Sequence, residues 1–185
     1  KVSLVYGAAG TGKTYLLNHI AQLFDERTKL FLANTNPAVD NLRRKIKAQN
    51  CDFLTIAKFL KKGKANVAYD MLIMDECSMI SNSDMQKVLE KAKYKLLVLV
   101  GDTYQIEAIS FGNWFSLAKY FLSKKTWNEL TTPFRAKNKE LLELWTKVRK
   151  LEDDVTEHLV NYGYSSVLND SIFKRNSMDE IILCL

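Results

Sequence analysis

A glycine-rich segment near the start of the chain constrains its fold more than any other feature. Residues 7–14 follow the pattern G-x-x-x-x-G-K-T, after an apolar run at 2–6 and before a helical pattern at 13–25. Glycines allow the sharp turn that points backbone N–H groups inward, and Lys13 adds a cation beside the positive end of a helix. This order of strand, loop and helix predicts a polyphosphate-binding loop. Its residues are Gly7, Ala8, Ala9, Gly10, Thr11, Gly12, Lys13 and Thr14.

Short apolar runs alternate with helical patterns along the first hundred residues. The predicted strands span 2–6, 30–34, 52–55, 71–74 and 96–100, and the predicted helices span 13–25, 37–49, 56–62 and 82–92. Such alternation is typical of an α/β fold in which helices cover both faces of a parallel sheet. The phosphate loop should then lie at the carboxyl ends of the strands.

The pattern changes after Gly112. Helices are predicted at 113–123 and 138–150, short helices within 153–173, and a final apolar strand at 180–185. A buried strand normally continues into a crossover, and the chain lacks an initiator Met. We therefore expect the sequence to be a fragment that is cut at both ends.

An acidic pair follows the strand predicted at 71–74. Asp75 is placed to hold Mg²⁺ together with the Thr14 hydroxyl, and Glu76 is placed to activate an attacking water. Gln105 lies just beyond the strand at 96–100, where a polar side chain can sense a terminal phosphate. A small-molecule kinase also fits the loop, but the adjacent Glu argues against it.

Bulk composition narrows the class of protein only slightly. The 185 residues are 47% hydrophobic, without an apolar stretch of membrane-spanning length or a signal peptide, so we expect a cytoplasmic protein and no membrane partner. Cys51, Cys77 and Cys184 lack metal-ligand spacing, which favours free thiols and no structural metal. The net charge of +6 and the basic run at 43–47 hint at an anionic partner, although a solvated helix face explains them equally well.

Taken in order, these motifs resemble those of superfamily 1 DNA helicases, particularly the RecD-like branch, whose core is a P-loop AAA-type ATPase domain. The motifs are residues 7–14, Ala-Asn-Thr-Asn-Pro-Ala at 33–38, Leu-Thr-Ile at 54–56, Asp-Glu-Cys-Ser-Met-Ile at 75–80, Gly-Asp-x-x-Gln-Ile at 101–106, Gly112, and Leu130 to Arg135. The resemblance implies a RecA-like ATP-binding motor domain at 1–125 and an incomplete second RecA-like domain at 126–185. It also implies ATP and Mg²⁺ as cofactors, with the remainder of the second motor domain as a partner.

The resemblance assigns roles to individual residues. Thr35 and Thr55 would contact the backbone of single-stranded DNA, with RNA left open, and Gln105 would couple the terminal phosphate to strand movement. Phe134 would stack on adenine, and Arg135 would reach the terminal phosphate. An ATP-gated binding module without translocation remains the alternative function.

Some positions depart from the family pattern. Ala57 stands where many relatives carry His, and Glu107-Ala108 replaces a Pro-containing pair, so base contacts by this loop are in doubt. Phe111 and Trp114 are candidates for base stacking, with core packing as the favoured interpretation. His19 and His158 are expected to have structural roles.

Overall fold

The computed structural model describes residues 1–62, 67–105, 112–134, 139–150 and 153–161. The chain forms two compact units, Lys1–Lys137 and Asn138–Leu185. Arg135, Phe111, Glu107-Ala108, Cys184 and the strand predicted at 180–185 lie outside the described residues.

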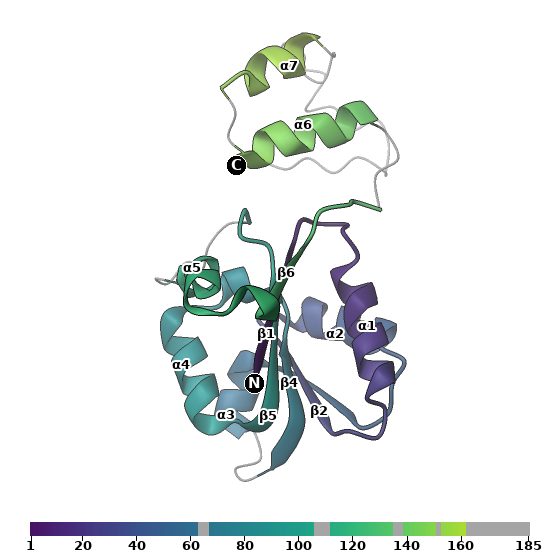
Figure 1. Ribbon diagram of the computed structural model, residues 1–185, viewed down its shortest axis with the longest axis vertical. Coiled ribbons are helices and arrows are strands. Elements are labelled where there is room, and N and C mark those ends of the chain that lie inside the picture. Colours follow the sequence, from purple (N-terminus) through teal and green to yellow (C-terminus); the bar gives the residue numbers. More distant parts are fainter. Residues whose placement is uncertain (63–66, 106–111, 135–138, 151–152, 162–185) are drawn as a thin grey trace, which may run out of the picture. The chain divides into compact units, whose positions relative to one another are not determined.

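The first unit is built on a six-stranded parallel sheet (Figure 1). Its strand order is β3-β2-β4-β5-β1-β6. The strands are β1 (Val2–Gly7), β2 (Lys29–Ala33), β3 (Cys51–Thr55), β4 (Ala68–Met74), β5 (Lys93–Gly101) and β6 (Trp127–Leu130). The first five confirm the predicted strands, with bounds that shift by a few residues.

Helices cover both faces of this sheet, which confirms the predicted fold class. One face carries α1 (Lys13–Leu23) and α2 (Asn36–Lys45), and the other carries α3 (Ile56–Lys62), α4 (Asn82–Lys91) and α5 (Trp114–Phe121) (Figure 1). Successive strand residues point to opposite faces, so Leu4 joins the core under α3, α4 and α5 while Val5 joins the core under α1 and α2. The carboxyl-terminal parts of the central strands β4 and β5, residues 71–74 and 96–100, are apolar without interruption because both faces of the sheet are covered there. Two short 3₁₀ turns complete the first unit, η1 (Cys77–Met79) and η2 (Lys124–Thr126).

The edge strand β6 is an element that the sequence pattern did not predict. It pairs in parallel with β1, from Leu4 opposite Trp127 to Gly7 opposite Leu130. Because this strand belongs to the first sheet, the first compact unit includes residues on both sides of position 125, and the domain boundary predicted there stays a prediction.

The second unit contains two described helices. These are α6 (Lys139–Lys150), which confirms the helix predicted at 138–150, and α7 (Val155–Asn161), which lies within the region where short helices were predicted. Lys147 and Asp154 form an ion pair between the end of α6 and the start of α7, and Leu144 is buried. Among the described residues, no helix combines the length and the apolar character needed to cross a lipid bilayer.

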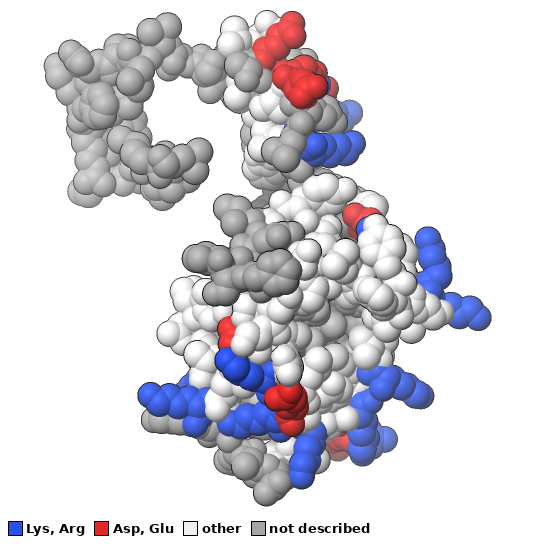
Figure 2. Space-filling view, turned by 90° about the vertical axis from the view of Figure 1, so that its left-hand side faces the viewer, with Lys and Arg blue, Asp and Glu red and all other residues white. Residues whose placement is uncertain are grey.

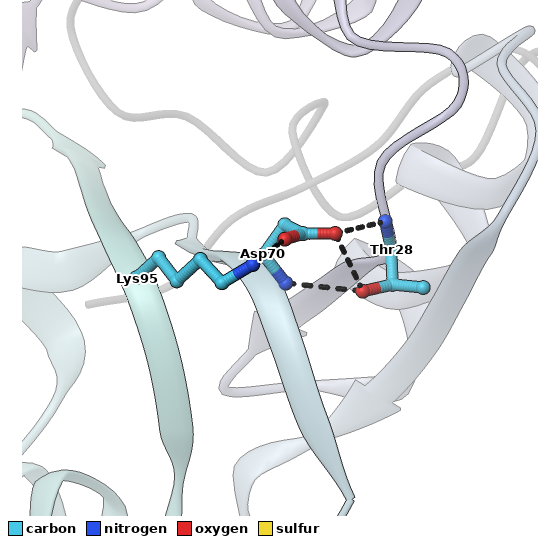
Figure 3. Close-up of polar contacts among 3 residues, drawn as sticks. All are labelled: Thr28, Asp70 and Lys95. Atoms are coloured by element: carbon cyan, nitrogen blue, oxygen red, sulfur yellow. Dashed lines mark hydrogen bonds and ion pairs between the residues drawn. The ribbon is translucent and has the colours of Figure 1, made fainter.

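A polar cluster links neighbouring strands toward their amino ends (Figure 3). Asp70 of β4 accepts hydrogen bonds from the backbone N–H and the hydroxyl of Thr28, at 3.1 and 3.2 Å, and pairs with Lys95 Nζ of β5 at 2.7 Å. The contact with Lys95 and, to a smaller extent, the hydrogen bonds from Thr28 lower the pKa of Asp70 to about 2. The cluster thus joins β4 and β5 to the residue that precedes β2, at the end of the sheet opposite the phosphate loop.

Lys29 is an unusual buried cation at the start of β2. Its side chain is fully buried, and Nζ donates to the carbonyls of Phe24, Asp25 and Arg27 at 2.7, 3.1 and 2.6 Å. These carbonyls follow the end of α1, where helical acceptors lack partners within the helix. Lys29 therefore fixes the end of α1 to the sheet.

Candidate nucleotide site

The loop between β1 and α1 has the backbone geometry that the glycine pattern predicts. Gly10 and Gly12 have φ angles of 79° and 87°, in the left-handed region that L side chains disfavour. Gly12 is the N-cap residue of α1, so the unpaired N–H groups of the first helical turn face the loop. Thr11 is buried, and its hydroxyl donates to Ala8 O at 2.8 Å, which braces the turn.

The Lys13 ammonium lies within this loop. Its Nζ donates to the carbonyls of Gly7 and Ala8 at 2.7 and 2.9 Å. A cation beside the N-terminus of a helix attracts polyphosphate, and Thr14 adds a hydroxyl in the same first turn. The residues present therefore fit a bound nucleotide.

The acidic pair lies where β4 ends. Asp75 extends the pairing with β2, because its N–H donates to Leu32 O at 2.9 Å, and its Oδ1 accepts the N–H of Glu76 at 2.9 Å. Burial raises the pKa of Asp75, while the bond from Glu76 and the charge of Lys13 oppose this rise. A buried carboxylate of this kind is stabilised by a nearby cation, so Asp75 and Thr14 fit a divalent metal ion.

Glu76 is half-buried and has a φ angle of 55°, in the left-handed region. Burial raises the pKa of Glu76, and the neighbouring charge of Asp75 raises it further. A raised pKa makes the carboxylate a stronger base, which suits a group that accepts a proton from water.

The end of β5 forms the next part of the site. Asp102 is buried, its Oδ1 accepts the N–H of Tyr104 at 3.1 Å, and its carbonyl accepts the N–H of Gln105 at 3.2 Å. This turn leaves Gln105 exposed. Gly101 precedes it, and a Cβ there would lie only 3.1 Å from the backbone nitrogen of Cys77. The end of β5 thus packs directly against the segment that follows Glu76.

Phe134 lies at the phosphate loop although it is far away in sequence. Its N–H donates to Gly10 O at 2.8 Å, and its ring Cδ2 lies 3.7 Å from the position of a Cβ on Gly12. The side chain is 74% exposed, so a ring face remains accessible. Arg135, its predicted partner, is outside the described residues.

These elements line one cleft of about 760 Å³. It lies at the carboxyl ends of β1, β4 and β5, three strands that neighbour one another in the sheet. The lining comprises Ala9, Gly10, Gly12, Lys13, Thr14, Tyr15, Asn18, Asn41, Lys45, Asp75, Glu76, Gly101, Asp102, Gln105 and Phe134.

Sequence reasoning gave no site role to six of these lining residues: Gly101 and Asp102 at the end of β5, Tyr15 and Asn18 on α1, and Asn41 and Lys45 on α2. The spacing of Asn41 and Lys45 places them on one helix face, and this was the available signal.

The two predicted nucleic-acid contacts lie outside this lining. Thr35 follows β2 and accepts the N–H of Ala38 at 3.3 Å, while Thr55 ends β3 and accepts the N–H of Lys58 at 3.2 Å. Both hydroxyls therefore cap a helix. Because β2 and β3 are parallel neighbours, both residues lie at the same edge of the sheet.

Two other candidates have structural surroundings. Trp114 packs against the core under α5, and its Nε1 donates to Ile80 O at 2.8 Å, in agreement with core packing. The ring of His19 lies beside that of Tyr15, with centroids 4.2 Å apart and the ring planes tilted by 43°. The side chain of His158 is not described.

Figure 2 shows the face of the first unit that carries α3, α4 and α5. Among the described residues on this face, most of the Lys and Arg side chains lie toward the lower end of the unit. On the other face, Arg43 pairs with Asp40 at 2.9 Å and lies over the ring of Phe53. The basic run of α2 thus has a structural explanation at Arg43, while Lys45 points to the cleft.

Comparison with known proteins supports this arrangement. The sequence matches the family described as AAA domain over residues 1–167. The fold is similar to that of the Pif1 helicase from Bacteroides in complex with ADP-AlF3 and ssDNA, with a TM-score of 0.61 and 17% identity over 86% of this chain and 44% of that chain. It is also similar to the Pif1 helicase from Candida albicans, with a TM-score of 0.58 and 21% identity over 91% of this chain and 45% of that chain.

The chain spans less than half the length of these solved structures. The family match confirms the predicted AAA-type ATPase domain, and the solved structures show a shared fold, whereas membership of superfamily 1 and of its RecD-like branch stays a prediction. Because the family match extends over residues 1–167 of 185, the chain belongs to the AAA domain family.

Proposed function

We propose that this chain is the ATP-binding and ATP-hydrolysing motor domain of a DNA helicase that acts on single-stranded DNA. One observation carries the proposal. The phosphate loop, the acidic pair and Gln105 line a single cleft at the carboxyl ends of neighbouring strands. A site for nucleotide binding alone needs the loop, whereas hydrolysis and its coupling to movement need the other residues.

The loop would hold the nucleotide phosphates through its backbone N–H groups and Lys13. Thr14 and Asp75 would hold Mg²⁺, which when bound would supply positive charge at the phosphate oxygens. The exposed ring of Phe134 lies at the loop, where it can stack on the nucleotide base.

Glu76 would accept the proton of the attacking water, and its raised pKa favours this role. Gln105 extends from the end of β5 into the same cleft, so it can respond to the terminal phosphate. We further propose that Arg135 reaches that phosphate, and that the region 126–185, whose first strand β6 belongs to the first sheet, contains the incomplete beginning of a second RecA-like domain of a RecD-like enzyme. The remainder of that domain would close the cleft.

Thr35 and Thr55 would contact the nucleic-acid backbone. They lie together at the edge of the sheet and can donate their hydroxyl protons to phosphate oxygens while they cap their helices. The Bacteroides Pif1 helicase was solved with ssDNA, which supports a single-stranded partner for a protein of this fold. Cys51 and Cys77 are free thiols, which supports a reducing compartment such as the cytoplasm.

ATP turnover of the full-length protein tests the proposal. Single-stranded DNA should accelerate turnover, and Glu76→Gln should lower the accelerated rate by about 10²- to 10⁴-fold because the general base is lost. Glu129→Gln is the matched control, since Glu129 is an exposed carboxylate outside the cleft lining. Residues 1–185 alone should bind nucleotide and turn it over weakly or not at all.

Two outcomes would contradict the helicase proposal. Turnover that ignores nucleic acid would favour an ATP-gated binding module. Acceleration by a small metabolite, with no response to single-stranded DNA, would favour a small-molecule kinase.

A further inference from the structure

The short turn that follows Glu76 is held by hydrogen bonds from two distant parts of the chain. Asn34 Nδ2 donates to Met79 O at 3.2 Å, and Trp114 Nε1 donates to Ile80 O at 2.8 Å. Met79 ends η1, and Ile80 is the next residue. The position of η1 therefore depends on the loop after β2 and on the start of α5.

Glu76 is the residue from which this turn begins. Its carbonyl accepts the N–H of Met79 at 3.0 Å, so Met79 and Glu76 move together. The left-handed φ of Glu76 is unfavourable for a residue with a side chain, and such a conformation persists only where the surrounding structure holds it. A hydrogen bond to Met79 O therefore stabilises the turn that holds Glu76, the proposed general base.

Asn34 lies between β2 and the proposed nucleic-acid contact. It directly follows Ala33, the last residue of β2, and precedes Thr35, whose hydroxyl caps α2. The same strand is bonded to the acidic pair a second time, because Leu32 O accepts the N–H of Asp75 at 2.9 Å. Asn34 is exposed, so nucleic acid held at Thr35 would constrain its backbone directly.

We propose that Asn34 is a positioning residue that couples nucleic-acid contact at Thr35 to the placement of Glu76. This inference rests on the proposed function. Nucleic acid at Thr35 orders the Asn34 loop, the bond to Met79 O is strengthened, and η1 holds Glu76 in its working orientation. The coupling therefore acts on kcat, because it changes the base and leaves the phosphate loop untouched.

Asn34→Asp tests the bond with little change of shape. A carboxylate cannot donate to Met79 O, so the ratio of DNA-stimulated to DNA-free ATP turnover should fall by about 2- to 12-fold, the factor that corresponds to one ordinary hydrogen bond. The KM for ATP should stay the same. Asn36→Asp is the matched control, because it adds the same charge to an exposed residue on the other side of Thr35 and should keep the wild-type ratio. Asn34→Gln keeps an amide donor, so its ratio of DNA-stimulated to DNA-free turnover should lie between those of Asn34→Asp and the wild type.

Trp114 provides a second measurement that does not depend on turnover. In residues 1–185 with Trp127→Phe and Trp145→Phe, Trp114 is the remaining tryptophan of the 185, and addition of single-stranded DNA should change its emission because this indole is bonded to Ile80 O. The change should disappear with Asn34→Asp and persist with Asn36→Asp.

Three results would overturn the inference while leaving the proposed function standing. These are an unchanged ratio with Asn34→Asp, equal losses with Asn34→Asp and Asn36→Asp, or a rise in KM that accounts for the whole effect. If DNA does not stimulate the wild-type protein at all, the proposed function itself fails, and the inference fails with it.

Discussion

Replacing Gly101 by alanine tests the close contact between β5 and the turn that follows Glu76. A Cβ at this position would lie 2.7 Å from Phe115 Cε1 and 3.1 Å from Cys77 N, whereas ordinary contacts begin at 3.4 Å. Phe115 is 1% exposed and packs against the ring of Tyr6 at a centroid distance of 4.9 Å, so it has no free space into which to shift. Overpacking of this kind costs about 1–3 kcal/mol of unfolding free energy. For a protein of this size, the corresponding drop in melting temperature is about 2–12 °C.

A double-mutant cycle isolates the cause of this loss. Phe115→Leu removes the ring edge that the new methyl group would meet, so Gly101→Ala should cost at least about 1 kcal/mol less in that background than in the wild type. Urea unfolding of the wild type, both single variants and the double variant gives the four free energies. If the two changes are additive within about 0.5 kcal/mol, the clash with Phe115 is not the cause and the reasoning is refuted.

Three further predictions concern cations and a carboxylate that the structure places in defined contacts. Lys29→Met should lower the unfolding free energy measured in urea titrations by about 2–4 kcal/mol, because the loss of a charged donor to three carbonyls outweighs the removed cost of burying a charge. Lys58→Met, on the surface, is the control and should change the unfolding free energy by less than about 0.5 kcal/mol. Asp70 has a folded-state pKa of about 2, below its ordinary value of 3.8, so its contribution to stability is present above pH 3.8 and is lost as the pH falls toward 2. Melting temperatures measured across this window should decline less steeply for Asp70→Asn than for the wild type, and an identical slope would refute the assignment. Lys13→Ala should weaken binding of a fluorescent ADP analogue by about 10- to 150-fold, because hydrogen bonds from a charged donor to phosphate are lost, and an unchanged affinity would contradict the place of this ammonium in the site.

The parallel sheet could be predicted because its central strands are buried on both faces. Strands such as 71–74 and 96–100 therefore read as uninterrupted apolar runs, and the polar residues after them mark the carboxyl edge. The strand β6 carries no such signal. Its residues Trp127–Leu130 are half-buried or exposed at the edge of the sheet, so pairing with β1 alone makes them a strand.

The hydrogen-bond partners of polar side chains were also beyond sequence reasoning. Lys29 belongs to a residue type that is almost always exposed, and only the three carbonyls gathered around its ammonium explain its burial. Likewise, Asn34 was part of a predicted motif, yet its bond to Met79 O depends on the packing of two loops. Pattern indicates the type of residue at a position, whereas the partner of that residue follows from the fold.

Sequence reasoning also missed the wall of the nucleotide cleft that α2 forms, because it depends on how two helices pack. Asn41 and Lys45 reach the cleft only because α2 packs beside α1, and this packing is reinforced where Asn18 Oδ1 accepts the N–H of Lys47 at 2.7 Å. Asn18 belongs to α1, the helix that follows the phosphate loop. The same helix therefore carries the phosphate-binding turn and contacts the segment that follows α2. A nucleotide whose phosphates bind at the N-terminus of α1 would therefore also contact the side chains of α2. The sequence left two interpretations of the basic run of α2, an anionic partner and a solvated helix face. The structure places Lys45 of this run in the lining of the proposed nucleotide cleft.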